Sequence, residues 1–346
     1  MKIFQIITLS ELGGAQSVVI NLANELVNEH EVIVIAGGDG AMWDSIDNRV
    51  KKIKINQLKR RISPLDIIVW LKLLYYGLKY NPDIVHLHSS KIGLLGRLSF
   101  SKRKVVYTVH GFDSIRVAYR KFLPLEKILN KRAAKIVAVS NYDNKNLMEE
   151  GVTSEALTIY NGIGKMKTDQ ILDDKFINLL NKNMSFKVLC IARLAPPKRF
   201  DLFCDIASRM PDVSFYWIGN QYQPDNLPSN LSCFGEIKNA ARLNKYIDLF
   251  ILPSDYEGLP ISIIEALSFG KPVVASNVGG VPDILDSKNG FAVENTTDAF
   301  CLKIRFYQQN KVEYEKACLA ALLSYEREFT LDKMVNHYEK MYSELL

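Results

Sequence analysis

Runs of consecutive valine, isoleucine and leucine alternate with helical stretches along most of the chain, and this alternation constrains the fold more than any other feature. Early runs include KIFQIITLS, HEVIVIAGG and KVVYTVHG. After a polar stretch at 164–175, the alternation begins again with FKVLCIAR and VSFYWIG. Near-continuous apolar runs are typical of strands buried on both faces of a parallel sheet. Such strands in alternation with helices indicate doubly wound α/β domains.

Two such series in a chain of 346 residues predict two domains, each with its own core. We place the first domain at residues 1–163 and the second at residues 164–330, followed by a last helix at 331–346. Doubly wound sheets bind ligands at the carboxyl ends of their strands. We therefore expect two Rossmann-like domains that face a ligand-binding cleft between them.

The composition is that of an ordinary globular protein, with 48% hydrophobic and 24% charged residues. The five cysteines form no CxxC pair, and a scattered set is typical of a reducing compartment. Residues 65–80 are strongly apolar, but Asp66, Lys72 and Lys79 interrupt them, so we expect no membrane-spanning segment. The opening run MKIFQIITLS is too short for a signal peptide. These features predict a cytoplasmic protein.

Glycines and basic residues follow predicted strands, where the ligand of such a sheet would bind. Gly13 and Gly14 stand between the first strand and the first helix, and N–H groups at a helix start suit a phosphate. The alternative is a simple turn. The fingerprint GxGxxG is absent here, which disfavours a nicotinamide cofactor. In IARLAPPKRFD, Arg193 and Lys198 are placed to clamp a diphosphate, the alternative being a pair of surface charges.

The stretch DYEGLPISIIEALSFGKPVVAS carries two glutamates, Glu257 in a loop and Glu265 in the helix that follows. A carboxylate is a natural acceptor for paired ribose hydroxyls, which is the role we expect for Glu265. Glu257 is expected to accept hydroxyl protons from a second sugar, while the N–H groups of Gly258 and Leu259 face a phosphate. The alternative is that both glutamates are charges that complement the helix dipole.

These motifs together resemble a known family. EGLPISIIEALSFGKPVVASNVGGVPDIL resembles the E-x7-E signature of the retaining family-4 glycosyltransferases, and LGGAQ, TVHG, IYNGI and IARLAPPK occur in the order expected for it. The resemblance implies a GT-B fold, a nucleotide sugar held mainly by the second domain, and a final helix at 331–346 that crosses back onto the first. PDIVHLHSSKIGLLGRL is similar to the bacterial capsular, exopolysaccharide and O-antigen branch, whose members often extend sugars on an undecaprenyl-diphosphate carrier.

The resemblance also implies ligands and residue roles. The donor would be a nucleotide-diphosphate sugar, with a UDP-sugar favoured, and the acceptor a saccharide linked to a lipid diphosphate. No cofactor and no nucleic-acid partner are implied. The implied site residues are Arg193 and Lys198 for the diphosphate, Glu265 for the ribose, Glu257 for the donor sugar, Gly13 or Gly14 for the phosphate, and His110 beside the reacting sugar.

Two positions depart from the family pattern. Arg199 stands where relatives usually have glycine, which leaves the shape of this loop open, and Gly164 replaces an acidic residue, a change expected to affect only the hinge. His86 and His88 lie on one face of a predicted strand and invite a metal site. However, no third zinc ligand is evident, and the chain has no Asp-x-Asp of the kind that metal-dependent glycosyltransferases use. We therefore expect no bound metal.

We expect a retaining, metal-independent transfer in which the acceptor hydroxyl attacks from the side that the nucleotide leaves. Arg193, Lys198 and helix N–H groups would stabilise the departing diphosphate, and Glu257 would position the sugar. A double displacement, with two carboxylates about 5 Å apart, stays open as an alternative. Two other GT-B activities, a sugar-nucleotide epimerase and a phosphorylase, stay open as well. A nucleic-acid-binding protein is a further alternative, although the chain shows no RNA-binding or recognition-helix motif.

Basic residues are concentrated in the first half of the chain. Residues 49–135 hold 21 Lys and Arg against 4 Asp and Glu, while residues 163–346 hold 21 against 23. RVKKIKINQLKRRIS at 49–63 has seven basic residues and is followed by the apolar PLDIIVWLKLLYYGLKY. This asymmetry favours an anionic partner. We predict peripheral attachment to an anionic membrane, at the inner face of the cell membrane, through the first domain. The alternative is a core helix with a solvated basic rim.

Overall fold

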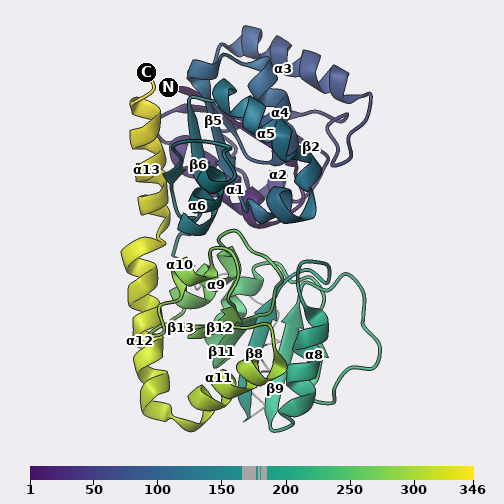
Figure 1. The fold of residues 1–346 in the computed structure, drawn as a ribbon, viewed down its shortest axis with the longest axis vertical. Coiled ribbons are helices and arrows are strands. Elements are labelled where there is room, and N and C mark those ends of the chain that lie inside the picture. Colours follow the sequence, from purple (N-terminus) through teal and green to yellow (C-terminus); the bar gives the residue numbers. More distant parts are fainter. Residues whose placement is uncertain (166–176, 178–179, 181–184) are drawn as a thin grey trace. The chain divides into compact units, whose positions relative to one another are not determined.

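The computed structural model of the protein describes residues 1–165, 177, 180 and 185–346, and these form two compact units (Figure 1). The first unit comprises Met1–Gly162 and Leu331–Leu346, and the second comprises Ile163–Thr330. Each unit contains a parallel sheet with helices packed on it. The expectation of two doubly wound α/β domains is confirmed.

The sheet of the first unit is built from the apolar runs of the sequence. Its strands are buried almost along their whole length, since helices cover both faces of a parallel sheet. Within the described residues the sheet has seven strands, which lie in the order β3 (Lys51–Lys54), β2 (Glu31–Gly37), β1 (Lys2–Leu9), β4 (Ile84–Leu87), β5 (Val105–Val109), β6 (Lys135–Ala138) and β7 (Leu157–Thr158).

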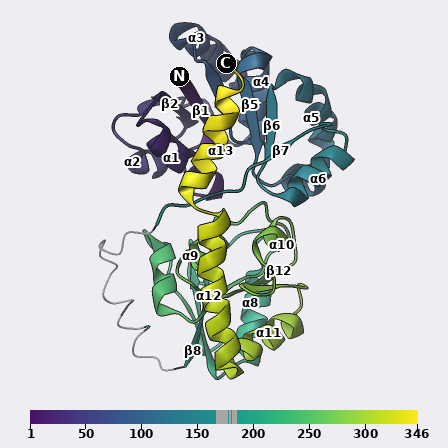
Figure 2. The same cartoon turned by 90° about the vertical axis from the view of Figure 1, so that its left-hand side faces the viewer.

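The helices of the first unit include one from the end of the chain. This helix, α13 (Leu331–Ser343), lies over β1 and β5 (Figure 2) and buries Tyr338 and Tyr342 against them. The other helices are α1 (Gly14–Leu26), α2 (Met42–Ser45), α3 (Asp66–Tyr80), α4 (Ser90–Ser99), α5 (Leu123–Leu129) and α6 (Asn141–Glu149), with short turns η1 (Lys102–Lys104), η2 (Ser114–Ala118), η3 (Arg120–Phe122) and η4 (Asn130–Arg132).

The second unit repeats the plan around another parallel sheet. In the part that the structure describes, the sheet has six strands in the order β10 (Leu231–Cys233), β9 (Val213–Ile218), β8 (Phe186–Ile191), β11 (Leu249–Leu252), β12 (Val273–Ser276) and β13 (Gly290–Val293). Its helices are α8 (Phe200–Arg209), η5 (Ala240–Tyr246), α9 (Ile261–Ser268), α10 (Val281–Ile284), α11 (Thr297–Gln309) and α12 (Lys311–Glu328).

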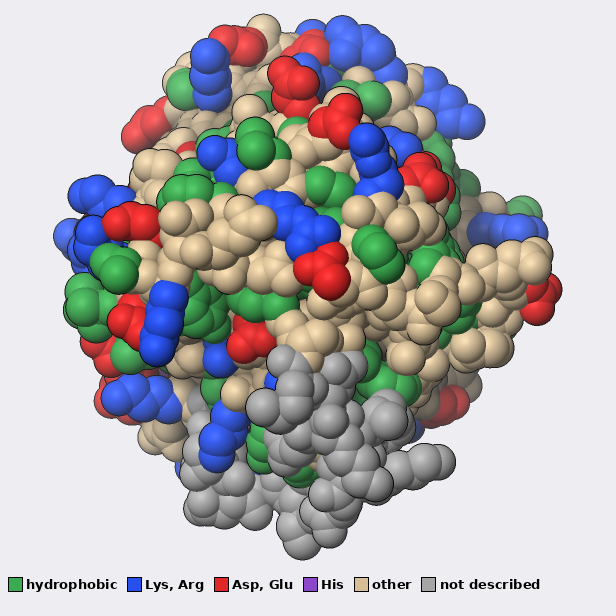
Figure 3. All heavy atoms as spheres, turned by 90° about the horizontal axis from the view of Figure 1, so that it is seen from below, with side chains coloured by type: hydrophobic (Ala, Val, Ile, Leu, Met, Phe, Trp, Pro, Cys, Tyr) green, Lys and Arg blue, Asp and Glu red, His purple; other side chains and the backbone are tan. Residues whose placement is uncertain are grey.

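Charges on the second unit are mixed. On the face shown in Figure 3, basic and acidic side chains are interspersed, in keeping with the near balance of 21 basic and 23 acidic residues in 163–346. No helix in the described parts of the chain combines the length and the apolar character that a membrane span requires.

The winding of each sheet reverses at one point. In the first unit the reversal lies between β1 and β4, and in the second it lies between β8 and β11. Ligands of doubly wound sheets bind at the carboxyl ends of the strands beside such a reversal. The loops after β1, β5, β8 and β11 and the helix starts that follow them carry the site residues predicted from the sequence, with Glu265 inside α9, so the topology places them at the ligand-binding end of each sheet.

Candidate functional site

In the second unit, the structure brings Lys198 and Glu257 into direct contact. Lys198 lies in the loop between β8 and α8, and Glu257 lies in the loop between β11 and α9. Nζ of Lys198 donates a hydrogen bond to Oε1 of Glu257 within an ion pair. The two side chains are only 20% and 11% exposed, so water screens the pair weakly. Both charges are therefore fixed at the ligand-binding end of the sheet.

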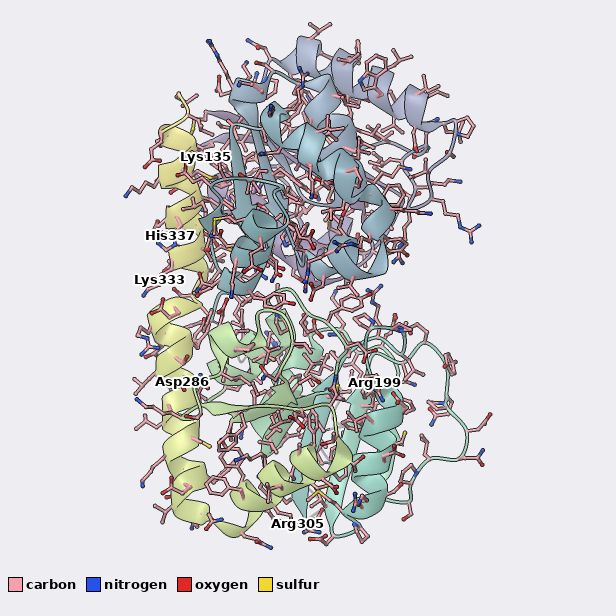
Figure 4. All side chains as sticks on the ribbon, viewed as in Figure 1. Lys135, Arg199, Asp286, Arg305, Lys333 and His337 are labelled. Carbon is pink, nitrogen blue, oxygen red and sulfur yellow. The ribbon has the colours of Figure 1, made fainter. Side chains whose placement is uncertain are left out.

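The two arginines of the same loop differ in their surroundings. Arg193 lies directly beyond β8, and its side chain is exposed. Arg199, labelled in Figure 4, donates from Nη2 to Asp201 at 2.6 Å and from Nη1 to Asp255 at 3.3 Å. The charge of Arg199 is thus matched by Asp201 in the first turn of α8 and by Asp255 in the loop after β11. Lys198 has the one carboxylate of Glu257 as its ion-pair partner among the described residues, and Arg193 is exposed.

A glycine pair that sequence reasoning missed, Gly279 and Gly280, supports the loop of Glu257. Gly279 has a φ of +54°, and a Cβ there would lie 1.7 Å from the carbonyl oxygen of Glu257. The N–H of Gly280 donates to the carbonyl oxygen of Gly258 at 2.8 Å. Only glycine tolerates both the backbone conformation and the close approach. The signal in the sequence was a glycine pair shortly after a buried strand.

Glu265 lies in the second turn of α9, half-buried, and no described residue donates a hydrogen bond to its carboxylate. Burial raises the pKa of this carboxyl from 4.5 to about 7. Gly258 and Leu259 precede Pro260, the N-cap residue of α9, and Leu259 is buried. The first turn of α9 has no acidic residue, which disfavours a helix-dipole role for Glu265, and Lys198 engages Glu257. Glu265 is available to accept ligand hydroxyls.

A pocket in the first unit lies at the carboxyl ends of β4 and β5. Its wall includes Ala15, which directly follows Gly13 and Gly14, as well as His110. A Cβ at Gly14, the first residue of α1, would meet nothing within 4 Å, whereas a Cβ at Gly13 would lie 2.9 Å from Oε1 of Gln16. Sequence reasoning missed the serines of this wall, although the polar run HSS at a strand end was a signal for them. The lining residues are Ala15, His88, Ser89, Ser90, Tyr107, Thr108, Val109, His110, Gly111 and Ser114.

His86 and His88, which invited a metal site, are instead part of a hydrogen-bonded cluster. Both rings are fully buried, and burial lowers their pKa values well below the usual range, so the rings are neutral. Protein hydrogen bonds engage every nitrogen of the two rings, which leaves none for an ion. The partners are Tyr342 and Thr108 for His86, at 2.6 and 2.7 Å, and Gln5 and His110 for His88, at 2.6 and 3.1 Å.

Two protein-family models match the chain. Glycosyltransferase Family 4 matches residues 12–164, and Glycosyl transferases group 1 matches residues 185–310. The UDP-Gal:alpha-D-GlcNAc-diphosphoundecaprenol alpha-1,3-galactosyltransferase of Escherichia coli is 30% identical over 337 residues, covering 87% of this chain and 86% of the relative. The O-antigen biosynthesis glycosyltransferase WbnH of Escherichia coli is 29% identical over 312 residues, covering 86% and 88%.

Solved structures share the fold over almost the whole chain. A glycosyltransferase from Rickettsia africae aligns with a TM-score of 0.81 at 24% identity, covering 99% of this chain and 98% of that one. Anabaena Alr3699/HepE, solved in complex with UDP-glucose, aligns with a TM-score of 0.86 at 19% identity, covering 99% and 100%.

Proposed function

Because the chain belongs to the family 4 glycosyltransferases and has the GT-B fold, we propose that it transfers a sugar from a UDP-sugar to a saccharide on a lipid diphosphate. The product would enter a bacterial surface polysaccharide such as O-antigen or capsule. The name of the Escherichia coli galactosyltransferase and the UDP-glucose complex of the Anabaena protein support these ligands. The observation that carries the proposal is the contact of Lys198 with Glu257, in a loop that also carries the exposed Arg193.

We assign the groups of the second unit to the parts of the donor. Arg193 and Lys198 bind the diphosphate, together with the N–H groups at the start of α9, where Gly258 and Leu259 lie. Glu265 accepts the ribose hydroxyls, and Glu257 accepts hydroxyls of the donor sugar. Glu257 neutralises Lys198 in the structure, so the arriving diphosphate takes over Lys198 and leaves the carboxylate of Glu257 to the sugar.

The proposed chemistry is a transfer with retention that needs no metal ion. As the bond to UDP breaks, negative charge grows on the phosphate, and Arg193 and Lys198 stabilise it in place of a metal. The acceptor hydroxyl attacks from the side of the departing UDP and gives its proton to the phosphate. Glu257 positions the sugar and is not the nucleophile. In the first unit, Gly13 or Gly14 approaches a phosphate, and His110 lies beside the reacting sugar.

A donor and acceptor panel tests this function. UDP-galactose, UDP-glucose and UDP-N-acetylglucosamine would be scored for protection against thermal unfolding and for slow donor hydrolysis. The best donor would then be incubated with N-acetylglucosamine diphosphate on a short lipid. We expect an extended lipid-linked saccharide with the anomeric configuration of the donor. A new sugar nucleotide formed without an acceptor, or a requirement for free phosphate, would instead identify an epimerase or a phosphorylase.

Metal removal should leave the activity unchanged. Because Arg193 and Lys198 supply the positive charge at the diphosphate, we expect equal turnover before and after dialysis against EDTA. The measurement is the initial rate with and without added magnesium or manganese. Loss of the rate with EDTA, restored by either ion, would contradict the mechanism. Among the described residues, Glu29, His30 and Glu339 are the group whose ligand atoms lie close enough for one ion, so Glu339→Gln shows whether any metal effect arises there.

We also propose that the first unit docks on an anionic membrane through α3 and the basic residues before it. A core helix would bury its apolar residues, but α3 fully buries only Val69 and Leu73. Leu71, Tyr75 and Leu78 are 53%, 54% and 86% exposed. An exposed apolar patch of this kind marks an interaction site. The exposed basic residues beside it, Lys59, Arg60 and Arg61, match the charge of an acidic leaflet.

Liposome sedimentation measures this attachment. We expect binding to anionic vesicles at low salt and much weaker binding at high salt, since each basic residue near the leaflet contributes about 1 kcal/mol that salt screens. Replacing Leu71, Tyr75 and Leu78 together with serine should abolish the binding. The matched control replaces three exposed leucines of the second unit, Leu302, Leu319 and Leu323, and should bind normally. Equal binding to neutral vesicles, or none to anionic ones at low salt, would refute the proposal.

A further inference from the structure

A line of hydrogen-bonded side chains connects the pocket of the first unit to α13. It begins at His110, whose Nε2 lies 3.1 Å from Nδ1 of His88. Nε2 of His88 lies 2.6 Å from Oε1 of Gln5, and Nε2 of Gln5 donates to the hydroxyl of Tyr342 at 3.2 Å. From Tyr342 the line continues through His86, Thr108 and Tyr338.

Gln5 sets the direction of these hydrogen bonds. Its Oε1 only accepts, so Nε2 of His88 carries the hydrogen atom in the bond between them. The ring of His88 is neutral, because burial lowers its pKa well below the usual value, and its Nδ1 therefore carries no hydrogen. The hydrogen atom between the two histidines consequently belongs to Nε2 of His110.

This arrangement leaves His110 with a bare Nδ1. Burial lowers the pKa of His110 to about 4, so near neutral pH the ring carries one hydrogen, and that hydrogen is on Nε2. Within the described residues, Nδ1 of His110 has no hydrogen-bond partner, and the ring lines the pocket beside Ser89, Ser90 and Ser114. A bare imidazole nitrogen accepts a hydrogen bond from a hydroxyl and offers no donor to a phosphate oxygen. The wall thus suits a neutral sugar hydroxyl.

We propose that His88 is a positioning residue, which holds His110 in the tautomer whose Nδ1 accepts a hydroxyl of the reacting sugar, and that Gln5 and Tyr342 anchor His88. The sugar in this statement rests on the proposed function, whereas the tautomer rests on the hydrogen bonds of the two buried, neutral rings. Gln5, His88 and Tyr342 are fully buried. A turn of any of these side chains would leave a buried polar group without a partner, which is unfavourable and keeps the line in one arrangement. Through Tyr342, the last helix of the chain contributes to the pocket.

Nuclear magnetic resonance of protein labelled with [15N]histidine tests the tautomer directly. The chain has five histidines, so the signals of His88 and His110 can be assigned from the variants His88→Gln and His110→Gln. We expect both rings to be neutral near pH 7, with the hydrogen on Nε2. A hydrogen on Nδ1 of His110 in the native protein would overturn the proposal.

The substitution Gln5→Glu should reverse the donor-to-acceptor direction of the hydrogen bond between His88 and His110, with almost no change in the shape of the side chain at position 5. A carboxylate at position 5 accepts from His88 and favours its protonated form, whose Nδ1 then donates to His110. We expect the hydrogen of His110 to move to Nδ1, and kcat/KM to fall by about tenfold, the size of one hydrogen bond, while the affinity for UDP stays unchanged. Gln5→Met removes both hydrogen bonds without adding charge, so neither direction of the line is fixed any longer. In that control we expect a mixture of the two tautomers of His110, in place of the full move to Nδ1 expected for Gln5→Glu.

These experiments test the tautomer of His110 and the proposed sugar transfer independently of each other. If Gln5→Glu leaves the tautomer of His110 unchanged, the positioning role of His88 is refuted. If the tautomer reverses and kcat/KM does not fall, Nδ1 does not accept a sugar hydroxyl. If the tautomer of His110 reverses and kcat/KM falls, the result supports both the positioning role of His88 and the acceptance of a sugar hydroxyl by Nδ1 of His110. If the native protein transfers no sugar at all, the proposed function fails, and the spectra still decide the tautomer.

Discussion

Lys198→Ala should lower kcat by about 30- to 1000-fold, which corresponds to about 2–4 kcal/mol of lost transition-state stabilisation. Lys198 lies in the loop after β8 and is already held in place by Glu257, so its charge is fixed before the donor arrives. Charge on the departing phosphate grows only as the bond breaks, and the loss should therefore appear in kcat more than in KM. Steady-state kinetics with the best donor of the panel measures both constants. We expect a loss of similar size for Arg193→Ala.

The ion pair provides the control for this experiment. Lys198→Ala leaves the carboxylate of Glu257 unpaired and only 11% exposed, so part of the effect would come from an uncompensated charge. Because Glu257 is itself proposed to hold the donor sugar, the cycle of Lys198→Ala, Glu257→Ala and the double variant is needed to separate that part from the loss of the sugar contact, and Lys198→Arg restores the charge with a different shape. A rise in KM with unchanged kcat would show that Lys198 only binds the donor. Thermal unfolding of each variant verifies that the fold persists at the assay temperature.

The two sheets were predictable because each depends on local composition. Strands such as β1, β5 and β8 are unbroken apolar runs, and the loops between them carry the glycines and polar residues that end strands. The exposure of α3 was not predictable. This helix is apolar on most of its faces, so the sequence does not show which face is buried, and the structure buries only Val69 and Leu73 fully. The choice depends on the packing of the whole first unit.

The residue types of the site could be predicted from the sequence, but the contacts between residues that lie far apart in the sequence could not. Lys198 and Glu257 were each predicted as site residues, but their ion pair joins loops 59 residues apart, and no local pattern encodes it. Tyr342 was missed for the same reason, since it meets His86 across 256 residues. The role of Gly279 was missed because a positive φ and a backbone clash are properties of the folded loop. Residue types at strand ends are thus readable from the sequence, whereas their pairings are not.

Glu265→Gln should weaken the binding of UDP and of the UDP-sugar by about tenfold at pH 8, because a hydrogen bond to a charged acceptor is replaced by one to a neutral acceptor. In the native protein we expect the affinity for UDP to fall as the pH drops below about 7, where the raised pKa lets the carboxyl of Glu265 take up a proton. In Glu265→Gln this part of the pH dependence should be absent, and only the part that comes from the phosphate of UDP itself, whose second pKa is about 6, should remain. Calorimetric titration of UDP between pH 5.5 and 8.5 measures both effects, on the order of tenfold per pH unit in the native protein. Glu257→Ala, which removes the partner that competes for Lys198, should not weaken UDP binding.

Without UDP, the stability of the protein should depend on pH in the sense opposite to the UDP affinity. It should rise as the pH falls. Because the pKa of Glu265 is raised on folding from 4.5 to about 7, the folded state holds a proton that the unfolded chain has lost, and stability falls as the pH rises through this interval. Glu265→Gln carries no such charge, so its Tm should exceed that of the native protein above pH 7 and approach it below pH 4.5. A substitution that stabilises the fold while it weakens UDP binding is typical of a group kept for its ligand. If Glu265→Gln lowered the Tm and left the affinity for UDP unchanged, Glu265 would be a structural residue of α9, and the ribose would have to be bound elsewhere.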